Sequence, residues 1–372
     1  MSALDGRGVP ADLMDTVTLG DCREVLLRLP DECVDLIFAD PPYNLQLRQE
    51  LWRPNRTKVD GVDEAWDRFG GFREYDAFSR QWLAACRRVL KPAGTIWVIG
   101  TYHNIYRLGT ILQDLGFWIL NDVVWIKSNP MPNFRGVRLT NAHETLIWAA
   151  KSQGARYTFH HHLAKRFNSG KQLRSDWYLP ICTGAERLRM DGRKLHPTQK
   201  PESLLRRILL ISSKVGDTVL DPFFGTGTTG AAAKRLGRHW IGIENEPVYV
   251  QAARERIAAV EPLPLNELLA LEQMGRSRLK VAVGELMQAG LLRPGQALLF
   301  DRDPARQATL MSDGRLQMGH AAGSIHQLGR LLSGGAPCNG WRHWYYADGG
   351  GLLRPIDDLR KAYRERRPPA EE

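Results

Sequence analysis

Short apolar runs alternate with segments of helical periodicity over about the first 260 residues of the chain. The runs VDLIFAD (34–40), TIWVIG (95–100) and DTVLD (217–221) have the length and apolar content of buried strands. Segments 76–90 and 202–213 instead repeat apolar residues every three or four positions, as an amphipathic helix does. Strands that alternate with helices predict an α/β fold, in which a doubly wound, mostly parallel sheet is covered by helices on both faces.

Two further apolar runs, FWILNDVVWIK (117–127) and ETLIWAA (144–150), follow each other without a helix between them. Parallel neighbours need a crossover connection that usually contains a helix, whereas antiparallel neighbours do not. We therefore expect these two strands to form an antiparallel hairpin at one edge of the sheet.

The pattern changes near residue 262. The segment EPLPLNE (261–267) carries two prolines and is expected to be a linker or a tethered turn. Beyond it the chain shows short helix and strand patterns, a hairpin signal at Asp313-Gly314 and an aromatic strand, WRHWYY (341–346). The sequence thus predicts a first domain over residues 1–262 and a separate small α+β domain over 275–372.

Composition places the chain among ordinary globular proteins, with 43% hydrophobic and 25% charged residues. No run of about 18 apolar residues is present, so we expect no transmembrane helix and no membrane partner. The N-terminal residues lack the apolar stretch of a secretory signal, and the five scattered cysteines form no Cys-x-x-Cys pair. These features favour a cytoplasmic location, and neither a disulfide framework nor a metal site is expected.

Positive charge is concentrated in one stretch of the chain. The whole protein has a formal net charge of +10, and residues 151–200 contain eleven basic and three acidic residues. A local basic excess is typical of a surface that binds a polyanion, although a solvated surface can have the same composition.

The first candidate functional motif is Asp40-Pro41-Pro42-Tyr43, which directly follows the predicted strand VDLIFA. Ligands of open α/β sheets bind beyond the carboxyl ends of the strands. The two prolines stiffen this turn and remove two backbone donors, so carbonyl oxygens and the Asp40 carboxylate are left as acceptors beside the flat Tyr43 ring. Acceptors next to an aromatic surface suit an extruded base with an exocyclic amino group. The alternative is a rigid turn with a capping aspartate.

The second motif is a Gly- and Thr-rich turn, DPFFGTGTTG (221–230), at the end of the predicted strand DTVLD and the start of a helix. Glycines allow a ligand to approach the backbone closely, and a helix N-terminus offers free N–H groups. The turn matches neither the dinucleotide-binding nor the Walker A pattern. Glu244 ends the next predicted strand, where an acidic group can accept hydrogen bonds from ribose hydroxyls. The combination favours a carboxylate-bearing nucleoside such as S-adenosylmethionine, and the alternative is a tight structural turn.

Together the two motifs resemble those of the amino-group DNA methyltransferases, and their order along the chain resembles the β group of that family. Similar segments cover essentially the whole chain: FADPPYNLQL, NPMPNF, NAHETLIWA, HPTQKP (196–201), DPFFGTGTTGAAAKRLGR, SIHQLG and CNGWRHW. They are similar to the alphaproteobacterial cell-cycle-regulated adenine methyltransferases, whose orphan members methylate adenine in GANTC. The C-terminal part resembles the RAMA domain found beside restriction and modification enzymes.

The resemblance implies a permuted, Rossmann-like methyltransferase domain, S-adenosyl-L-methionine as the cofactor, double-stranded DNA as the substrate and a homodimer. It implies that the Asp-Pro-Pro-Tyr turn holds the flipped base and that the Gly- and Thr-rich turn binds the cofactor. The expected catalytic residues are Asp40, Pro41, Pro42 and Tyr43. The expected cofactor-binding residues are Asp21, His196, Thr198, Lys200, Asp221, Pro222, Phe223, Phe224, Gly225, Gly227, Thr228, Thr229 and Glu244.

DNA recognition requires side chains at base edges and basic residues at phosphates. The long polar loop at 44–71 is expected to fold over DNA, and the alternative is a surface lid. Aromatic residues of the C-terminal domain could stack on unpaired bases or form its core. The expected DNA-binding residues are Ser128, Asn129, Asn133, Arg135, Lys165, Arg166, Lys171 and Arg174 in a target-recognition segment at 128–195, and Asn339, Trp341 and Arg342 in the C-terminal domain.

These features predict a site-specific DNA adenine-N6 methyltransferase that acts on a flipped adenine, with GANTC implied by the resemblance alone. Three alternatives stay open: a cytosine-N4 methyltransferase, a catalytically silent DNA-binding homologue, and an enzyme that methylates RNA or a small molecule. The basic stretch and the extra domain favour a polynucleotide substrate.

Overall fold

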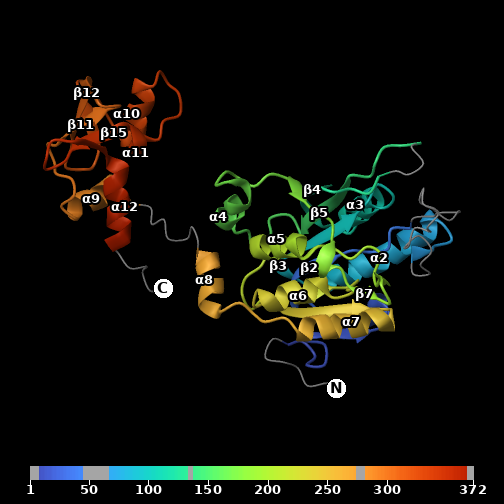
Figure 1. The fold of residues 1–372 in the computed structure, drawn as a ribbon. Helices are drawn as coiled ribbons and strands as arrows, with labels where there is room; N and C mark the ends of the chain where they lie inside the picture. Colours follow the sequence, from blue (N-terminus) through green and yellow to red (C-terminus); the bar gives the residue numbers. More distant parts are fainter. Residues whose placement is uncertain (1–7, 45–66, 133–136, 274–280, 367–372) are drawn as a thin grey trace. The chain divides into compact units, whose positions relative to one another are not determined.

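The computed structural model describes residues 8–44, 67–132, 137–273 and 281–366 of the chain. The chain divides into two compact units, Met1–Met274 and Gly275–Glu372, and each is described by itself (Figure 1). Most of the loop expected to fold over DNA lies outside the described residues, and so do Asn133 and Arg135.

The larger unit contains an eight-stranded sheet. Its strands are β1 (Thr16–Leu19), β2 (Val34–Ala39), β3 (Leu90–Gly100), β4 (Trp118–Lys127), β5 (His143–Ala150), β6 (Asp176–Leu179), β9 (Thr218–Asp221) and β10 (His239–Glu244). They lie in the order β1-β10-β9-β2-β3-β5-β4-β6, and the first five run parallel to one another. The predicted α/β fold class is confirmed.

The predicted hairpin is present, but it does not form the edge of the sheet. Strand β5 pairs antiparallel with both β3 and β4, as expected. Strand β6 pairs parallel with β4 on the outside and takes the edge position. Strand β6 lies inside the turn-rich basic stretch and was not predicted, because the polar residues and turn signals around it obscure its pattern. The same stretch holds a small ribbon of β7 (Arg189–Met190) and β8 (Arg193–Lys194) and the 3-10 turns Lys165–Asn168 and Gly184–Glu186.

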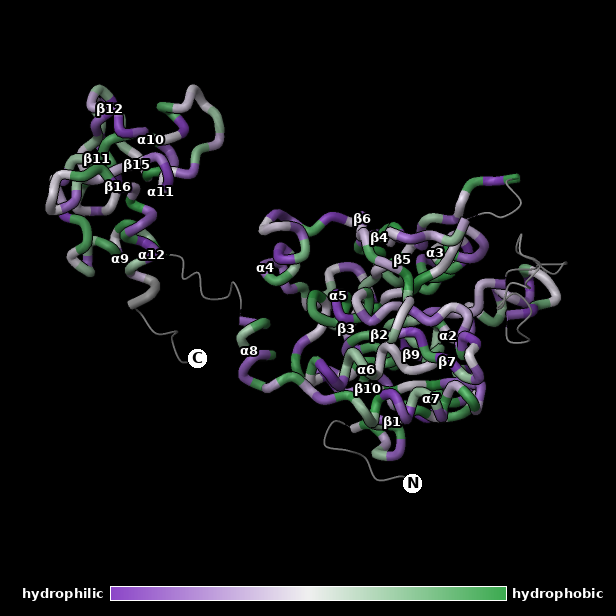
Figure 2. Tube along the Cα trace, in the orientation of Figure 1, coloured by the Kyte–Doolittle hydropathy of each residue, from purple (hydrophilic) through white to green (hydrophobic). Residues whose placement is uncertain are grey.

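Helices cover both faces of this sheet. One face carries α1 (Cys22–Val25), the 3-10 turn Leu26–Arg28, α2 (Phe72–Val89) and α3 (Ile105–Asp114), and the other carries α4 (His161–Ala164), α5 (Glu202–Ser212), α6 (Thr228–Arg235), α7 (Pro247–Ala258) and α8 (Leu265–Gln273). Successive residues of β2 belong to opposite apolar clusters: Leu36 and Phe38 to one, Ile37 and Ala39 to the other. A strand that is apolar on both faces is typical of a parallel sheet covered by helices on both sides. The two apolar clusters contribute to the hydrophobic colour in the middle of the larger unit (Figure 2).

Helix α8 begins inside the segment that was expected to be a linker or a tethered turn. The Pro264 carbonyl accepts the first helical hydrogen bonds, so the prolines start a helix here. Leu268 is 2% exposed, and Glu272 forms an ion pair with the buried Arg238 at 3.1 Å. Helix α8 therefore packs on the larger unit, beyond the boundary at residue 262 that the sequence suggested.

In its described residues, 281–366, the smaller unit combines a six-stranded antiparallel sheet with four helices. Its elements are α9 (Val283–Gln288), β11 (Ala297–Phe300), β12 (Asp303–Leu310), β13 (Leu316–Met318), β14 (Ala321–Gly323), α10 (Ile325–Leu332), α11 (Gly340–His343), β15 (Trp344–Ala347), β16 (Leu353–Pro355) and α12 (Ile356–Arg366). The strand order is β14-β13-β12-β11-β15-β16, and the predicted hairpin around Asp313-Gly314 joins β12 to β13.

The aromatic segment 341–346 is a strand only in its second half. Its first residues form the helical turn α11, and β15 starts at Trp344. At the start of this turn, a Cβ atom on Gly340 would lie 2.3 Å from the Ile325 carbonyl oxygen. Close packing against α10 therefore favours a helical turn at Gly340–His343. The alternating aromatic residues of this segment had predicted a strand instead.

Within the described ranges, no helix combines the length and the apolar character needed to cross a bilayer.

Candidate functional site

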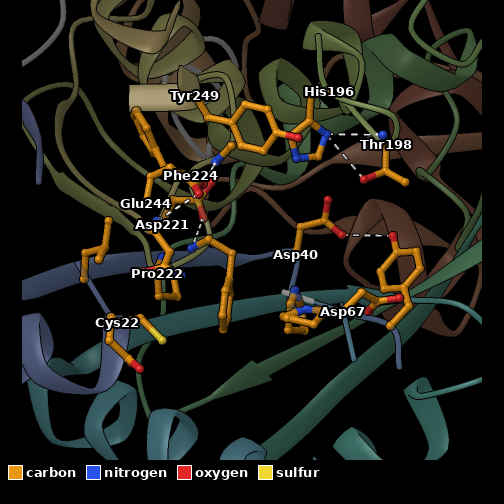
Figure 3. A pocket seen from close by; sticks show the side chains of 18 of the residues that line it. Cys22, Asp40, Asp67, His196, Thr198, Asp221, Pro222, Phe224, Glu244 and Tyr249 are labelled. Carbon is orange, nitrogen blue, oxygen red and sulfur yellow. Dashed lines mark hydrogen bonds between the residues drawn. The ribbon is translucent and has the colours of Figure 1, made fainter. Parts of the chain in front are cut away.

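One cavity lies beyond the carboxyl ends of the parallel strands and has a volume of about 420 Å³. Small-molecule sites typically measure about 300–1,000 Å³. Both predicted motifs line this cavity, because the Asp-Pro-Pro-Tyr turn follows β2, the Gly- and Thr-rich turn follows β9, and β2 and β9 are parallel neighbours. Figure 3 shows Asp40, Asp221, His196 and Glu244 around the same hollow. The fold thus brings together two turns that are far apart in the sequence.

Two buried side chains fix the Asp-Pro-Pro-Tyr turn. The Tyr75 hydroxyl donates to the Pro42 carbonyl oxygen at 2.9 Å, and the Asn104 amide donates to the same oxygen at 3.3 Å. The Pro42 carbonyl therefore holds the turn in place and is not one of the free acceptors that the sequence analysis expected. Pro41 and the Asp40 carboxylate line the cavity.

Asp40 belongs to a buried group of five side chains, Asp40, Tyr43, Lys127, Glu144 and Lys200, which we term the charge cluster. The Lys200 ammonium donates to Asp40 Oδ2 at 2.5 Å and to the Tyr43 oxygen at 2.9 Å. The Tyr43 hydroxyl lies 2.9 Å from Asp40 Oδ1 and 3.2 Å from Glu144 Oε2. Lys127 pairs with Glu144 at 2.8 Å. Lys200, which the resemblance assigned to the cofactor, thus binds the Asp40 carboxylate.

Burial and neighbouring charges act in opposite directions on the pKa values of the charge cluster. Burial raises the pKa of Asp40, and Lys200 offsets only part of that effect. Burial also opposes ionisation of Glu144, but Lys200 and Lys127 together outweigh it and lower the pKa of Glu144. Burial disfavours the charged form of Lys200, yet its two carboxylate neighbours raise its pKa. The surroundings therefore favour the protonated form of Asp40 and the ionised form of Glu144.

Neither Glu144 nor Lys127 is among the residues predicted from the sequence. Glu144 stands at the start of the apolar run ETLIWAA, and a charged residue in an otherwise buried strand was the available signal. Pairing of β4 with β5 brings the two residues together across the hairpin.

Asp221 holds the Gly- and Thr-rich turn. Its carboxylate accepts the Phe223 N–H at 2.9 Å and the Thr229 hydroxyl at 2.6 Å, and burial raises the pKa of Asp221 to about 7. Gly227 has a φ of 78°, and a Cβ atom there would lie 2.9 Å from that of Ala253. Glycine is therefore required at this position both for the backbone conformation and for packing against α7.

Glu244 ends β10 and lines the cavity. Its Oε1 accepts the N–H groups of Asn245 and Glu246 at 2.8 and 2.9 Å, and its Oε2 accepts the Gly225 N–H at 2.6 Å. Burial raises the pKa of Glu244. Because a carboxylate oxygen can accept two hydrogen bonds, Oε2 keeps acceptor capacity for a hydroxyl group.

His196 and Thr198 close the cavity against the Gly- and Thr-rich turn. His196 Nδ1 accepts the Thr198 N–H at 3.2 Å, and the imidazole packs against the Tyr249 ring at 4.6 Å between centroids. Burial lowers the pKa of His196 to about 3, so the ring is neutral at physiological pH. A Cβ atom on Gly225 would lie 3.4 Å from His196 Nε2, which leaves little room for a larger residue.

Asp21, one of the expected cofactor-binding residues, lines the cavity and also caps α1. Its Oδ1 accepts the Arg23 N–H at 2.8 Å, and the Arg23 guanidinium binds Oδ2 at 2.6 Å. The hydrogen bond from the Arg23 side chain lowers the pKa of Asp21. An anionic group thus stands at this end of the cavity.

Aromatic rings form an apolar wall of the cavity, to which Phe69, Phe78 and Phe223 contribute. Phe223 also packs edge-on against Trp82 at 5.1 Å between centroids. Of these three residues, only Phe223 was predicted from the sequence, because no local pattern shows that Phe69, before α2, and Phe78, on α2, meet the turn after β9.

Three expected cofactor residues use their side chains mainly to hold the fold. The Phe224 ring is 3% exposed and stacks on Trp240 at 5.2 Å, so most of it lies in the apolar core. The Thr228 hydroxyl accepts a hydrogen bond from Arg256 at 2.8 Å, and the Thr229 hydroxyl donates to Asp221. These residues line the cavity, as does Pro222, but their side chains act as supports.

Those expected DNA-binding residues of the larger unit that the structure describes lie outside the cavity. Ser128 and Asn129 are exposed just after β4, and the Asn129 side chain accepts the Ile181 N–H at 3.0 Å. Arg174 forms an ion pair with Asp176 at 2.8 Å. Lys165, Arg166 and Lys171 lie on or next to the 3-10 turn after α4, where Lys165 is half-buried and the other two are exposed.

The expected role of Trp341 in stacking on bases is contradicted by its position in the smaller unit. Its ring is 6% exposed, belongs to the apolar core and lies under the Arg360 guanidinium at 4.4 Å. Helix α11 turns Trp341 inward, whereas Asn339 and Arg342 on either side are exposed. Trp341 is therefore a core residue, and the two polar residues remain available for contact.

Among the residues that the structure describes, no group of three or more His, Cys, Asp or Glu side chains is arranged to hold a metal ion.

Two family models match the chain. The DNA methylase model N6_N4_Mtase matches residues 34–255, and the RAMA model (Restriction Enzyme Adenine Methylase Associated) matches residues 270–368. The chain is 46% identical over 354 residues to the Type II methyltransferase M.HinfI of Haemophilus influenzae, which covers 95% of this chain and 97% of that protein. It is 43% identical over 241 residues to the Type II methyltransferase M2.DpnII of Streptococcus pneumoniae, which covers 64% of this chain and 88% of that protein.

A solved structure shares the fold of the larger unit. The PvuII DNA methyltransferase (cytosine-N4-specific) matches with a TM-score of 0.51 and 22% identity over 69% of this chain and 90% of that chain. The N6_N4_Mtase model spans more than half of the chain, and the similarity to M.HinfI spans nearly all of it. The chain therefore belongs to the N6_N4_Mtase family of DNA methylases, whose methyl donor is S-adenosylmethionine.

Proposed function

We propose that this DNA methyltransferase is site-specific and transfers a methyl group to N6 of an adenine that is flipped out of the duplex. The observation that carries this proposal is the shared cavity, in which the Asp-Pro-Pro-Tyr turn and the Gly- and Thr-rich turn lie on one edge of the sheet. Methylation of an amino group requires a methyl donor and a base to meet in a single site, and this cavity offers one.

The residues around the Gly- and Thr-rich turn fit S-adenosylmethionine. Glu244 has acceptor capacity for ribose hydroxyls, and the apolar wall suits a purine ring. Gly225 leaves the space that a side chain would fill beside His196. When bound, the cofactor supplies a methyl group that its sulfonium already activates. We therefore assign Asp21, His196, Thr198, Gly225 and Glu244 to the binding of the cofactor.

Asp40 is the group that we assign to the base. An exocyclic amino group is a weak nucleophile, because its lone pair is delocalised into the ring. By accepting a hydrogen bond from this group, Asp40 directs the nitrogen lone pair into the cavity. It also takes up the proton that the nitrogen loses as it is methylated, and the raised pKa of the buried carboxyl supports this role. Tyr43, next to Asp40, contributes an aromatic surface for the base.

The choice of adenine, the site GANTC and the homodimer rest on the resemblance to the cell-cycle-regulated adenine methyltransferases. The match to the RAMA model, whose description refers to adenine methylases, supports adenine. We assign DNA contacts to Ser128, Asn129, Lys165, Arg166, Lys171, Asn339 and Arg342, all of which are exposed or half-buried.

Transfer of tritiated methyl groups to duplexes that differ at single positions tests this proposal. We expect incorporation only into duplexes that contain GANTC, and nucleoside analysis should identify the product as N6-methyladenine. N4-methylcytosine as the product would establish the alternative reaction on the same scaffold, and a lack of incorporation into any duplex would contradict the proposal.

A further inference from the structure

We infer that Glu144 and Lys127 are positioning residues, which set the proton affinity of Asp40 through Lys200 and Tyr43. The inference rests on the proposed function, because it concerns the surroundings of the carboxylate that we assign to the base. Neither Glu144 nor Lys127 lines the cavity, so both act on the reaction only through the other members of the charge cluster.

The hydrogen bonds of Lys200 direct its ammonium group to Asp40. Its three N–H groups have three acceptors: Asp40 Oδ2 at 2.5 Å, the Tyr43 oxygen at 2.9 Å and the Thr198 carbonyl at 3.2 Å. Glu144 Oε2 lies 3.8 Å from the same nitrogen, too far for a hydrogen bond but close enough for a strong charge interaction. Glu144 and Asp40 thus compete electrostatically for one cation.

Tyr43 links the two carboxylates with a single proton. Because its oxygen accepts a hydrogen bond from Lys200, its own proton is donated either to Asp40 Oδ1 at 2.9 Å or to Glu144 Oε2 at 3.2 Å. While Asp40 is ionised, Lys200 and Tyr43 can both donate to it. Once Asp40 has taken a proton from the amino nitrogen, Glu144 is the ionised acceptor to which the phenol can turn. The cluster accommodates the change without moving a heavy atom.

Lys127 decides how strongly Glu144 competes. It pairs with Glu144 Oε1 at 2.8 Å and balances most of the charge of that carboxylate. Without the Glu144 charge, Asp40 would be the one carboxylate of the charge cluster that interacts with the Lys200 ammonium, and the pKa of Asp40 would fall. Loss of the Lys127 charge would turn Glu144 more fully toward Lys200 and raise the pKa of Asp40. A role confined to packing would not produce shifts of opposite sign.

The other ionisable groups near the cluster are the same residues in every variant compared. The charge of Asp40 acts on Asp221 of the neighbouring strand, and Arg187 acts on Lys200. His196 faces Lys200 as a neutral ring. Because none of these groups changes in the variants, a difference between variants reports on Glu144 and Lys127.

The test is the pH dependence of a single turnover of methyl transfer, with the full-length enzyme saturated with S-adenosylmethionine and duplex DNA. The rate should fall at acid pH as Asp40 becomes protonated, and we call this part of the pH–rate profile the acid limb. We expect the acid limb to move to lower pH by roughly one unit in Glu144→Gln, and to higher pH by a similar amount in Lys127→Met. Glu272→Gln is the matched control, because it removes a carboxylate from another buried ion pair that does not line the cavity. This control should lose stability and keep the wild-type acid limb.

Acid limbs that stay in place, or that move in the same direction in both variants, would overturn the inference. Should either variant fail to fold, the pKa of Asp40 can be measured from its carboxyl ¹³C shift in the remaining variant and in the wild type. A shift in the direction expected for that variant supports the inference, and an unchanged or opposite pKa overturns it. Failure of the proposed function looks different, because the wild-type enzyme would then transfer no methyl group to DNA, or Asp40→Ala would retain turnover.

Discussion

At the scale of single residues, the carboxyl edge of the sheet holds carboxylates with very different proton affinities within one site. Burial raises the pKa of Asp40 and of Asp221, whereas the two lysines around Glu144 lower its pKa. Environments that drive neighbouring pKa values apart are how proteins assign proton acceptors and permanent charges. Asp40 is thereby suited to take up a proton, and Glu144 is suited to remain charged.

Asp221→Asn should change the pH dependence of stability. Asp221 has a pKa of about 7 in the folded protein against an ordinary value of 3.8, so between these values only the folded state holds the proton. The free energy of unfolding therefore falls as the pH rises from about 4 to about 7, by up to roughly 4 kcal/mol, and is then flat. The variant lacks this contribution. Urea unfolding of both cofactor-free proteins across this range should show the wild type losing stability relative to the variant, and a difference independent of pH would contradict the assignment.

The sequence predicted residues of the site that stand directly at strand ends, and it failed for residues defined by contacts across strands. Asp40, Asp221 and Glu244 follow or end apolar runs. Because parallel strands place their carboxyl ends at the same edge of the sheet, the sequence was enough to predict that these three residues lie at one edge. Glu144 meets Lys200 only through the pairing of β3 with β5 and the path of the chain into α5, which no local pattern records.

At the scale of elements, segments with a clear apolar pattern were predictable, and segments without one were not. Helix α2 has a clear helical periodicity and the strands β2, β9 and β10 are continuous apolar runs, and each occurs where the sequence suggested. Strand β6, with four residues, and the helical turn α11 gain their structure from neighbours, namely β4 and α10. Tertiary contacts thus determine the elements whose own sequence is ambiguous.

Helix α8 gives a prediction at this scale. Leu268 is 2% exposed against the larger unit, whereas the adjacent Leu269 is 40% exposed. Leu268→Ala should lower the free energy of unfolding by about 2–5 kcal/mol, because it leaves a cavity under the helix, and Leu269→Ala should change it by less than about 1 kcal/mol. Urea unfolding of the full-length variants measures both. Equal effects would show that α8 does not pack as described.

At the scale of the whole molecule, the chain has two units with separate apolar cores. The cavity and the charge cluster belong entirely to the larger unit. The smaller unit matches the RAMA model and exposes Asn339 and Arg342 beside the buried Trp341. This division assigns the chemistry to the larger unit and proposes DNA contact for the smaller one.

Removal of the smaller unit tests this division. A chain that ends at Met274 retains α8 and the whole cavity, so it should bind S-adenosylmethionine as the full chain does. We expect its affinity for duplex DNA to fall at least tenfold, because the exposed polar and basic residues of the smaller unit are lost. Calorimetry with the cofactor and fluorescence anisotropy with duplex DNA provide the two readings. An unchanged DNA affinity would mean that the smaller unit has another role.

We propose that Asp40 and the Gly- and Thr-rich turn serve one reaction in one cavity, each with its own task. Single-turnover methyl transfer by Asp40→Ala, measured beside its affinity for S-adenosylmethionine, tests this claim most directly. We predict a loss of transfer by at least about a thousandfold, with cofactor affinity changed by no more than a few fold, since Asp40 directs the base and the turn binds the cofactor. Transfer near the wild-type rate would contradict the claim.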